Sequence, residues 1–127
     1  MEPVAIVTAA ALIQYLFLAY QVSAARVKHG VRAPATTGHP EFERAFRIHQ
    51  NTLEALVVFI PALWMFGIYV HALAGAAIGL LFPIGREVYR RSYHKDPSTR
   101  TPGSAISGVA MVTLLLGGLI GAVVSWL

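Results

Sequence analysis

The sequence predicts an all-α integral membrane protein, a four-helix bundle with up-down topology. Hydrophobic residues make up 56% of the 127 residues and charged residues only 13%, whereas ordinary soluble domains are less apolar and about twice as charged. The apolar residues form long runs, and the charged residues gather between those runs. A chain of this length has room for a single domain, residues 1–127.

The first apolar run extends from Val4 to Ala25 and contains only weakly polar interruptions. It is long enough to cross a hydrocarbon core of about 30 Å, and Pro3 suits a first helical turn. A signal peptide is the alternative, but Glu2 stands where a basic leading region would be expected, and the basic residues follow the run. We therefore predict a first transmembrane helix here.

The second apolar run, from Ala55 to Gly85, is too long for one crossing, which needs roughly 20 residues. The run must therefore fold back, and Gly67 or the segment Val70–Gly75 is the predicted turn. The second helix is then expected to run from Pro40 to Val70. Because proline and glycine loosen helical hydrogen bonding, kinks are predicted at Pro61, Pro83 and Gly85.

The third helix is expected to end in the basic segment Arg86–Lys95. Asp96, Pro97 and Pro102 mark the loop that follows. The segment Ser104–Leu127 supplies a fourth apolar span, which completes the four predicted helices.

All ten Lys and Arg residues lie in or beside the loops after the first and third helices. The positive-inside rule then places both basic loops in the cytoplasm and both termini on the opposite side of the membrane. The net charge of +4 comes with no basic arm or RNA-binding motif, so we expect no nucleic-acid partner. The two clusters are Arg26, Lys28, Arg32, Arg44 and Arg47, and then Arg86, Arg90, Arg91, Lys95 and Arg100.

The chain contains no cysteine. Disulfides, Cys-ligated zinc and a protein thiol nucleophile are therefore excluded, and no metal site is expected. Any sulfur chemistry would need a thiol carried by a ligand.

The second helix begins with a polar stripe, in which Arg44, Arg47, Asn51 and Glu54 are spaced to share one face. Intramembrane carboxylates usually face a bundle interior and have a partner, so Glu54 is expected to point inward and to pair with Arg26 or Arg47. A structural ion-pair network is the alternative interpretation. The surplus of guanidinium groups instead favours a ligand that bears carboxylates.

The end of the third helix repeats this pattern, because Arg86, Tyr89 and Tyr93 are spaced 3 and 4 residues apart, with Arg90 adjacent. Tyrosines near a membrane boundary are often only interfacial anchors. The shared face with Arg86 favours a role in ligand binding.

Three patterns taken together are typical of one family. They are PEFERAFRIHQNTLEALVVFIPALW, the overlapping stretch TTGHPEFER, and the string Arg86, Tyr89, Tyr93 and Arg100. They resemble the membrane-associated proteins in eicosanoid and glutathione metabolism, and the match spans most of the chain. TTGHPEFER is similar to the leukotriene synthase branch of that family.

The resemblance implies a homotrimer of four-helix protomers, with glutathione bound as a co-substrate between neighbouring protomers near the cytoplasmic side. Arg100 matches the residue that favours the glutathione thiolate, and the implied activity is transfer of glutathione to a lipophilic electrophile from the bilayer. Membrane lipids are further partners. Peroxide reduction by the same thiolate is left open. The positions that match glutathione contacts or neighbouring polar positions of the motif are Arg26, Arg44, Arg47, His49, Asn51, Glu54, Arg86, Tyr89 and Tyr93.

Three positions depart from the synthase pattern. Val27 replaces a second arginine that acts on the lipid epoxide, Ala55 replaces a tyrosine, and His49 replaces a glutamine contact. These changes alter the acceptor side, so a general transferase is the expected activity.

The sequence leaves two other classes of function open. A non-catalytic lipid-binding protein of the same family is the main alternative, although Arg100 and the full stripe argue against it. A channel or transporter is less favoured, because polar residues would be expected along a whole helix and the last span is almost wholly apolar.

Overall fold

The computed structural model describes residues 1–127, and helices are its only regular secondary structure, with four segments long and apolar enough to cross a membrane. This confirms the predicted all-α fold and its four membrane-spanning helices. α3 and α4 together form the third span. The elements are α1 (Glu2–His29), α2 (Pro40–Tyr69), α3 (Ala72–Gly79), α4 (Leu81–Lys95), the 3-10 turn η1 (Pro97–Thr99) and α5 (Thr101–Trp126).

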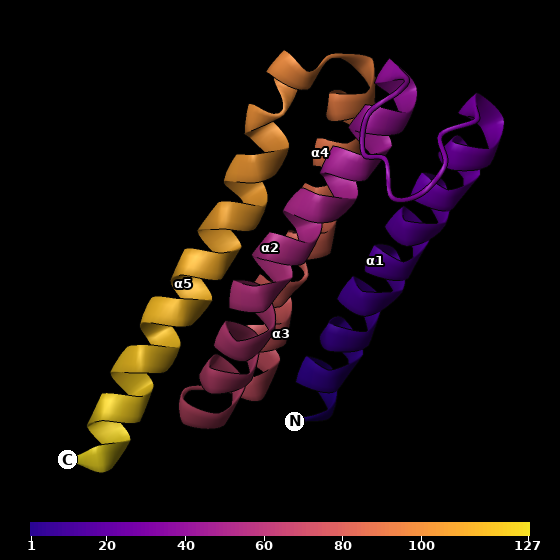
Figure 1. Ribbon diagram of the computed structural model, residues 1–127. Helices are drawn as coiled ribbons and strands as arrows, with labels where there is room; N and C mark the ends of the chain where they lie inside the picture. Colours follow the sequence, from indigo (N-terminus) through magenta and orange to yellow (C-terminus); the bar gives the residue numbers. More distant parts are fainter.

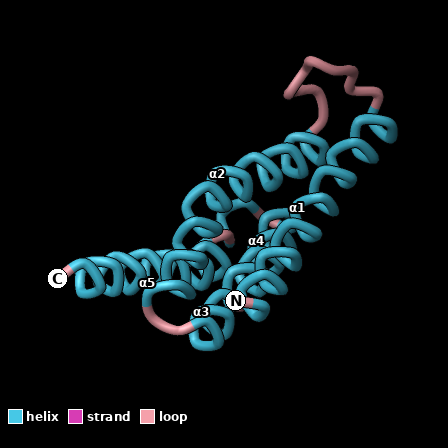
Figure 2. Tube along the Cα trace, turned by 90° about the horizontal axis from the view of Figure 1, so that it is seen from below, coloured by secondary structure: helices cyan, strands magenta, loops and turns pink.

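The spans run alternately up and down, so both termini and the α2–α3 turn lie at one end of the molecule (Figure 1). The α1–α2 connector and the α4–α5 link lie at the other end, which we call the basic end because the Lys and Arg clusters lie in these segments or on the helix ends beside them. α1 packs against α2 and α3, whereas α5 packs against α2 and α4. α1 and α5 therefore lie on opposite sides of α2 (Figure 2).

The third span is interrupted at Leu80, three residues before Pro83. Proline lacks the N–H that would bond to the carbonyl four residues earlier, and its ring clashes with that carbonyl, which here belongs to Gly79. The predicted irregularity is thus present, one turn nearer the N-terminus than Pro83 itself. α2 in contrast continues through Pro61 as one helix.

The turn between α2 and α3 falls at Val70 and His71, within the predicted segment. The His71 side chain caps α3 by accepting a hydrogen bond from the backbone N–H of Ala74 at 3.2 Å. A free N–H of the first helical turn is thereby satisfied.

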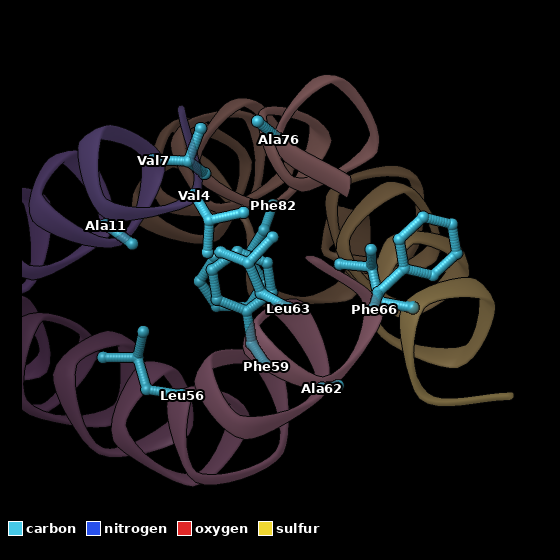
Figure 3. Close-up of a cluster of buried hydrophobic side chains, with 11 residues drawn as sticks. Val4, Val7, Ala11, Leu56, Phe59, Ala62, Leu63, Phe66, Ala76 and Phe82 are labelled. Atoms are coloured by element: carbon cyan, nitrogen blue, oxygen red, sulfur yellow. The ribbon is translucent and has the colours of Figure 1, made fainter. Parts of the chain in front are cut away.

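The main hydrophobic core lies in the half of the bundle away from the basic end, and Figure 3 shows its buried side chains pointing toward one another. Its centre is the stacked pair Phe59 of α2 and Phe82 of α4, whose ring centroids are 4.0 Å apart. α1, α3 and α5 each add small or branched side chains. The full cluster is Val4, Val7, Ala11, Leu56, Phe59, Ala62, Leu63, Phe66, Ala76, Phe82 and Leu114.

The outward faces of the spans are apolar as well. Ile13, Leu16 and Val57 are 66%, 67% and 68% exposed, and such large apolar surfaces are rare on soluble monomers. Lipid tails are the solvent that this surface requires, so the chain is an integral, multi-pass membrane protein.

Candidate functional site

Polar side chains of α2, α4 and α5 line a hollow of about 330 Å³ toward the basic end. We call it the α2–α4–α5 hollow. It contains five of the residues predicted from the sequence as ligand-binding or catalytic. Its lining residues are Asn51, Glu54, Ala55, Arg86, Tyr89, Arg100, Ser104, Ser107 and Met111.

One wall of the hollow is fixed by a hydrogen bond between α2 and α4. The amide Nδ2 of Asn51 donates to the hydroxyl of Tyr89 over 2.6 Å. Tyr89 is only 2% exposed, so this bond is shielded from water and from lipid. The two polar stripes predicted from the sequence therefore meet at this pair.

Arg86 is a buried cation without a carboxylate partner. It is 6% exposed, its Nη2 donates to the Ser107 hydroxyl over 2.9 Å, and its guanidinium carbon lies 4.3 Å from the centroid of the Tyr89 ring. Its Nε has no hydrogen-bond partner. Because a buried charge is costly unless it is paired, this guanidinium is suited to an anionic ligand.

Two glycines allow α4 and α5 to approach closely beside the hollow. A Cβ atom on Gly85 would lie 2.7 Å from the backbone nitrogen of Ser107, and one on Gly103 would lie 2.6 Å from the Cα of Tyr89. Neither position has room for a side chain. This contact between backbones brings the Ser107 hydroxyl to Arg86.

Glu54 does not point into the bundle, and the sequence prediction of an inward orientation is wrong. Its side chain is exposed on the protomer surface, and no ion pair joins it to Arg26 or Arg47. It lies 14 residues into α2, about 21 Å along the helix at 1.5 Å per residue. A carboxylate at this depth needs a partner from outside the protomer.

Arg100 lies directly before α5 and is exposed. Its guanidinium makes no hydrogen bond or ion pair within the protomer, so it is available to a ligand in the hollow. The preceding turn is held by Asp96, whose carboxylate accepts a hydrogen bond from the backbone N–H of Ser98. That bond holds the pKa of Asp96 below its ordinary value.

A second hollow, of about 300 Å³, lies at the basic end. Arg44, Arg47 and Tyr93 line it, and the Tyr93 ring lies 5.4 Å, centroid to centroid, from that of Tyr89. Arg44 already serves the fold, because its Nη1 donates to the backbone oxygen of His94 over 2.8 Å at the C-terminal end of α4. Arg47 is exposed, and its guanidinium remains free for a ligand.

Arg26 and His49 are the two predicted site residues that line neither hollow. The Nη1 of Arg26 donates to the backbone oxygen of Ala35 over 2.7 Å, and its guanidinium lies 4.7 Å from the Phe42 ring. His49 stacks on Tyr15 of α1, with ring centroids 4.5 Å apart. Both residues therefore lie where α1 meets α2, outside the two hollows.

Sequence reasoning missed several residues that line the hollows: Thr36, Thr37, Ser104, Ser107 and Met111. Ser107 had a signal, because Ser104 and Ser107 are spaced to share a face at the start of an otherwise apolar helix. Thr36 and Thr37 begin the TTGHPEFER stretch, whereas Met111 carried no signal that separates it from ordinary lipid-facing residues.

His29, His39 and Glu41 form the one group of side chains whose ligand atoms are close enough to hold a metal ion, within 4.8 Å of one another. The two imidazole rings are stacked with centroids 3.6 Å apart and planes 10° apart. A metal ion lies in the plane of each imidazole that binds it, and two parallel rings cannot share such an ion. The cluster instead closes the α1–α2 connector, with His29 Nε2 2.9 Å from Glu41 Oε2.

Comparison with known proteins gives one consistent result. The MAPEG family model matches residues 4–120. An uncharacterized protein of Synechocystis is 40% identical over 116 residues, which are 91% of this chain and 85% of that protein. Human microsomal glutathione S-transferase 2 is 40% identical over 107 residues, 84% of this chain and 73% of its own. Leukotriene C4 synthase of Cavia porcellus is 34% identical over 129 residues, 99% of this chain and 86% of its own.

Proposed function

This chain belongs to the MAPEG family, and on that premise we propose that it is a membrane transferase that binds glutathione, holds its thiol as a thiolate and conjugates it to lipophilic electrophiles. The observation that carries the proposal is the α2–α4–α5 hollow. Three charged side chains line this hollow without an ion-pair partner from their own protomer. They are the buried Arg86 and the exposed Arg100 and Glu54. A zwitterionic ligand of net negative charge supplies those partners.

The charges of the site match the groups that glutathione carries. Glutathione has two carboxylates and one ammonium group, and guanidinium groups bind carboxylates with paired N–H donors. Arg47 and Arg86 are the proposed carboxylate partners, and Glu54 is the proposed partner of the ammonium group. Asn51 and Tyr89 offer amide and hydroxyl groups to the peptide bonds.

Arg100 is the proposed activator of the thiol. The thiolate is the nucleophile, and its formation is limited by a thiol pKa of about 8.5. Lowering that pKa by about two units requires ~2.7 kcal/mol of preferential stabilisation of the charged form, which one close guanidinium in a partly dry site supplies. The thiol proton leaves to solvent, the sulfur attacks the electrophilic carbon, a C–S bond forms and the leaving group departs.

The electrophile is proposed to enter from the bilayer. Ala55 and Met111 give the hollow an apolar border, and the small Ala55 leaves room beside Glu54 where the synthase pattern has a tyrosine. This supports a transferase of broad substrate range over one shaped for a single lipid epoxide.

The site is proposed to be completed by a neighbouring protomer of a homotrimer. Arg26 and His49 lie on the α1 side of α2, whereas the other site residues gather beside α4 and α5. In a ring of identical subunits, one face of each protomer meets the other face of the next. The exposed Glu54 is then covered by the ligand and the neighbouring protomer. We further propose, from the positive-inside rule, that the basic end faces the cytoplasm.

The test is a conjugation assay on the purified protein with glutathione and a chloronitrobenzene electrophile. The expected result is a rate above the uncatalysed one that saturates with glutathione and falls at least tenfold in Arg100→Leu. A rate no higher than the uncatalysed one across several electrophiles, in a protein that still binds glutathione, would contradict transferase activity. That outcome would favour a non-catalytic accessory protein.

A further inference from the structure

A groove lies at the basic end between the last turns of α1 and α4, separate from the proposed glutathione site. It consists of two adjoining hollows of about 250 and 650 Å³. The two hollows share Gln21, Glu41 and His94. We call them together the α1–α4 groove, and none of its lining residues lines the α2–α4–α5 hollow.

The α1–α4 groove changes from apolar to polar along its length. Phe17, Tyr20 and Ala24 line the smaller hollow, and the first two are 45% and 68% exposed on the lipid-facing surface of α1. Every residue that lines the larger hollow is polar, and most of them come from the last two turns of α4. An acyl chain fits the first part and a charged head group the second.

The net charge of the α1–α4 groove, counted together with the neighbouring Glu87, is positive. Glu87 binds both Arg90, at 2.7 and 2.9 Å, and Arg91, at 2.8 Å. Glu41 pairs with Lys28 at 3.3 Å. Lys95 has no carboxylate partner. Four cations around the groove therefore face two carboxylates, which leaves two positive charges.

Arg91 and Lys95 are the donors best placed for an anion in this groove. Both are exposed at the membrane boundary, and Arg91 uses only its Nε in the bond to Glu87, so its two terminal nitrogens remain free. Arg90 is held more tightly, because Glu87 takes two of its nitrogens and its guanidinium lies over Phe17 at 5.6 Å. That contact joins the cationic part of the groove to its apolar part.

We propose that the α1–α4 groove binds an anionic phospholipid of the surrounding bilayer, with one acyl chain along Phe17 and Tyr20 and the phosphate at Arg91 and Lys95. Guanidinium and ammonium groups bind phosphate through charge-assisted hydrogen bonds, and basic pockets between transmembrane helices bind anionic head groups. A volume of about 650 Å³ in the polar part suits a phosphodiester head group better than the single carboxylate of a fatty acid.

The test measures bound lipid by native mass spectrometry on the full chain in neutral detergent. Phosphatidylglycerol, phosphatidylcholine with the same acyl chains, and oleate are added in separate arms. Lys95→Gln removes a cation of the groove, and Arg32→Gln is the matched control, because it removes the same charge from an exposed connector position that lines neither part of the groove. Ala24→Trp fills the apolar part.

The expected result is that the parent protein retains phosphatidylglycerol in preference to phosphatidylcholine. Lys95→Gln should weaken that retention about fivefold, the effect of one basic residue near an anionic head group. Ala24→Trp should weaken it for both phospholipids, while Arg32→Gln should match the parent. Equal retention by Lys95→Gln and Arg32→Gln, or no preference for phosphatidylglycerol in the parent, would overturn the proposal. Oleate retained as firmly as phosphatidylglycerol would overturn the assignment of a phospholipid.

Discussion

Arg86 and Glu54 each carry a charge that no side chain of the same protomer neutralises, although both lie within membrane-spanning helices. The hydroxyl of Ser107 and the ring of Tyr89 stabilise Arg86, but neither carries an opposite charge. Charges at such depth are retained where they contact a ligand or a second subunit. The proposed glutathione site explains both residues through the same ligand.

Replacing Glu54 with Gln tests whether this residue is the partner of the glutathione ammonium group. Glutathione should raise the Tm of the parent, because a ligand that binds only the folded protein stabilises it. In Glu54→Gln a charge-assisted hydrogen bond is lost, so the glutathione Kd should rise about tenfold and the Tm shift should shrink. Glu2→Gln is the matched control, because Glu2 is exposed at the opposite end of the molecule. Equal Tm shifts in both variants would contradict the role of Glu54.

Helical spacing predicted which site residues share a face but not which way each face points. The three-residue spacing of Asn51 and Glu54 correctly predicted that the two residues lie close together, and both line one hollow. The direction of Glu54 was predicted wrongly, because the expectation of an interior partner treats the protomer as complete. Arg100 follows a turn rather than a helix, so periodicity could not place it. Only the resemblance to a family indicated its position.

Among the elements, the contact between α4 and α5 positions the site most directly. Gly85 and Gly103 let the two backbones touch, and the contact places Ser107 against Arg86. The break in the third span at Leu80 separates α4 from α3. The sequence indicated the break through Pro83 but gave Gly85 the role of loosening a helix, whereas the structure uses it for close packing.

The packing role of Gly103 predicts opposite effects for two Gly→Ala changes in α5. A methyl group at Gly103 would overlap the backbone of Tyr89, so Gly103→Ala should lower the free energy of unfolding by about 1–3 kcal/mol. Nothing lies within 4 Å of a Cβ at Gly108. Gly108→Ala should therefore be neutral or stabilise by up to about 1 kcal/mol. Thermal unfolding in detergent measures both, and equal effects at the two positions would contradict the described α4–α5 contact.

The hydrophobic core and the polar hollows lie toward opposite ends of the molecule. The hydrophobic core lies away from the basic end, and the polar hollows lie toward it. The number of spans and the grouping of the basic loops could be predicted from the sequence, because both follow from the length, hydropathy and charge of consecutive residues. The sequence could not predict the separation of Arg26 and His49 from the other site residues, because that depends on how α1 packs against α2.

At the molecular scale, that separation predicts complementation between inactive variants. If each site takes Arg26 from one protomer and Arg100 from its neighbour, Arg26→Leu and Arg100→Leu should each be poorly active alone. Coexpression should restore activity to about a quarter of the parental value. With random mixing, half of the protomers keep Arg26 and the other half keep Arg100, so about a quarter of the interfaces combine an intact Arg26 with an intact Arg100. Activity no greater than that of the separate variants would show that each site lies within one protomer.

We propose above all that this protein binds glutathione as a thiolate that Arg100 stabilises. The ultraviolet absorbance of the thiolate, recorded as glutathione is added to purified protein at neutral pH, tests it directly. The parent should give a saturable thiolate signal, and Arg100→Leu should give the same signal only at a pH higher by about one to two units, because the stabilising charge is gone. Arg100→Lys should be intermediate, since the charge remains while the planar guanidinium is lost. No thiolate signal in the parent, or a full signal in Arg100→Leu at neutral pH, would contradict the claim.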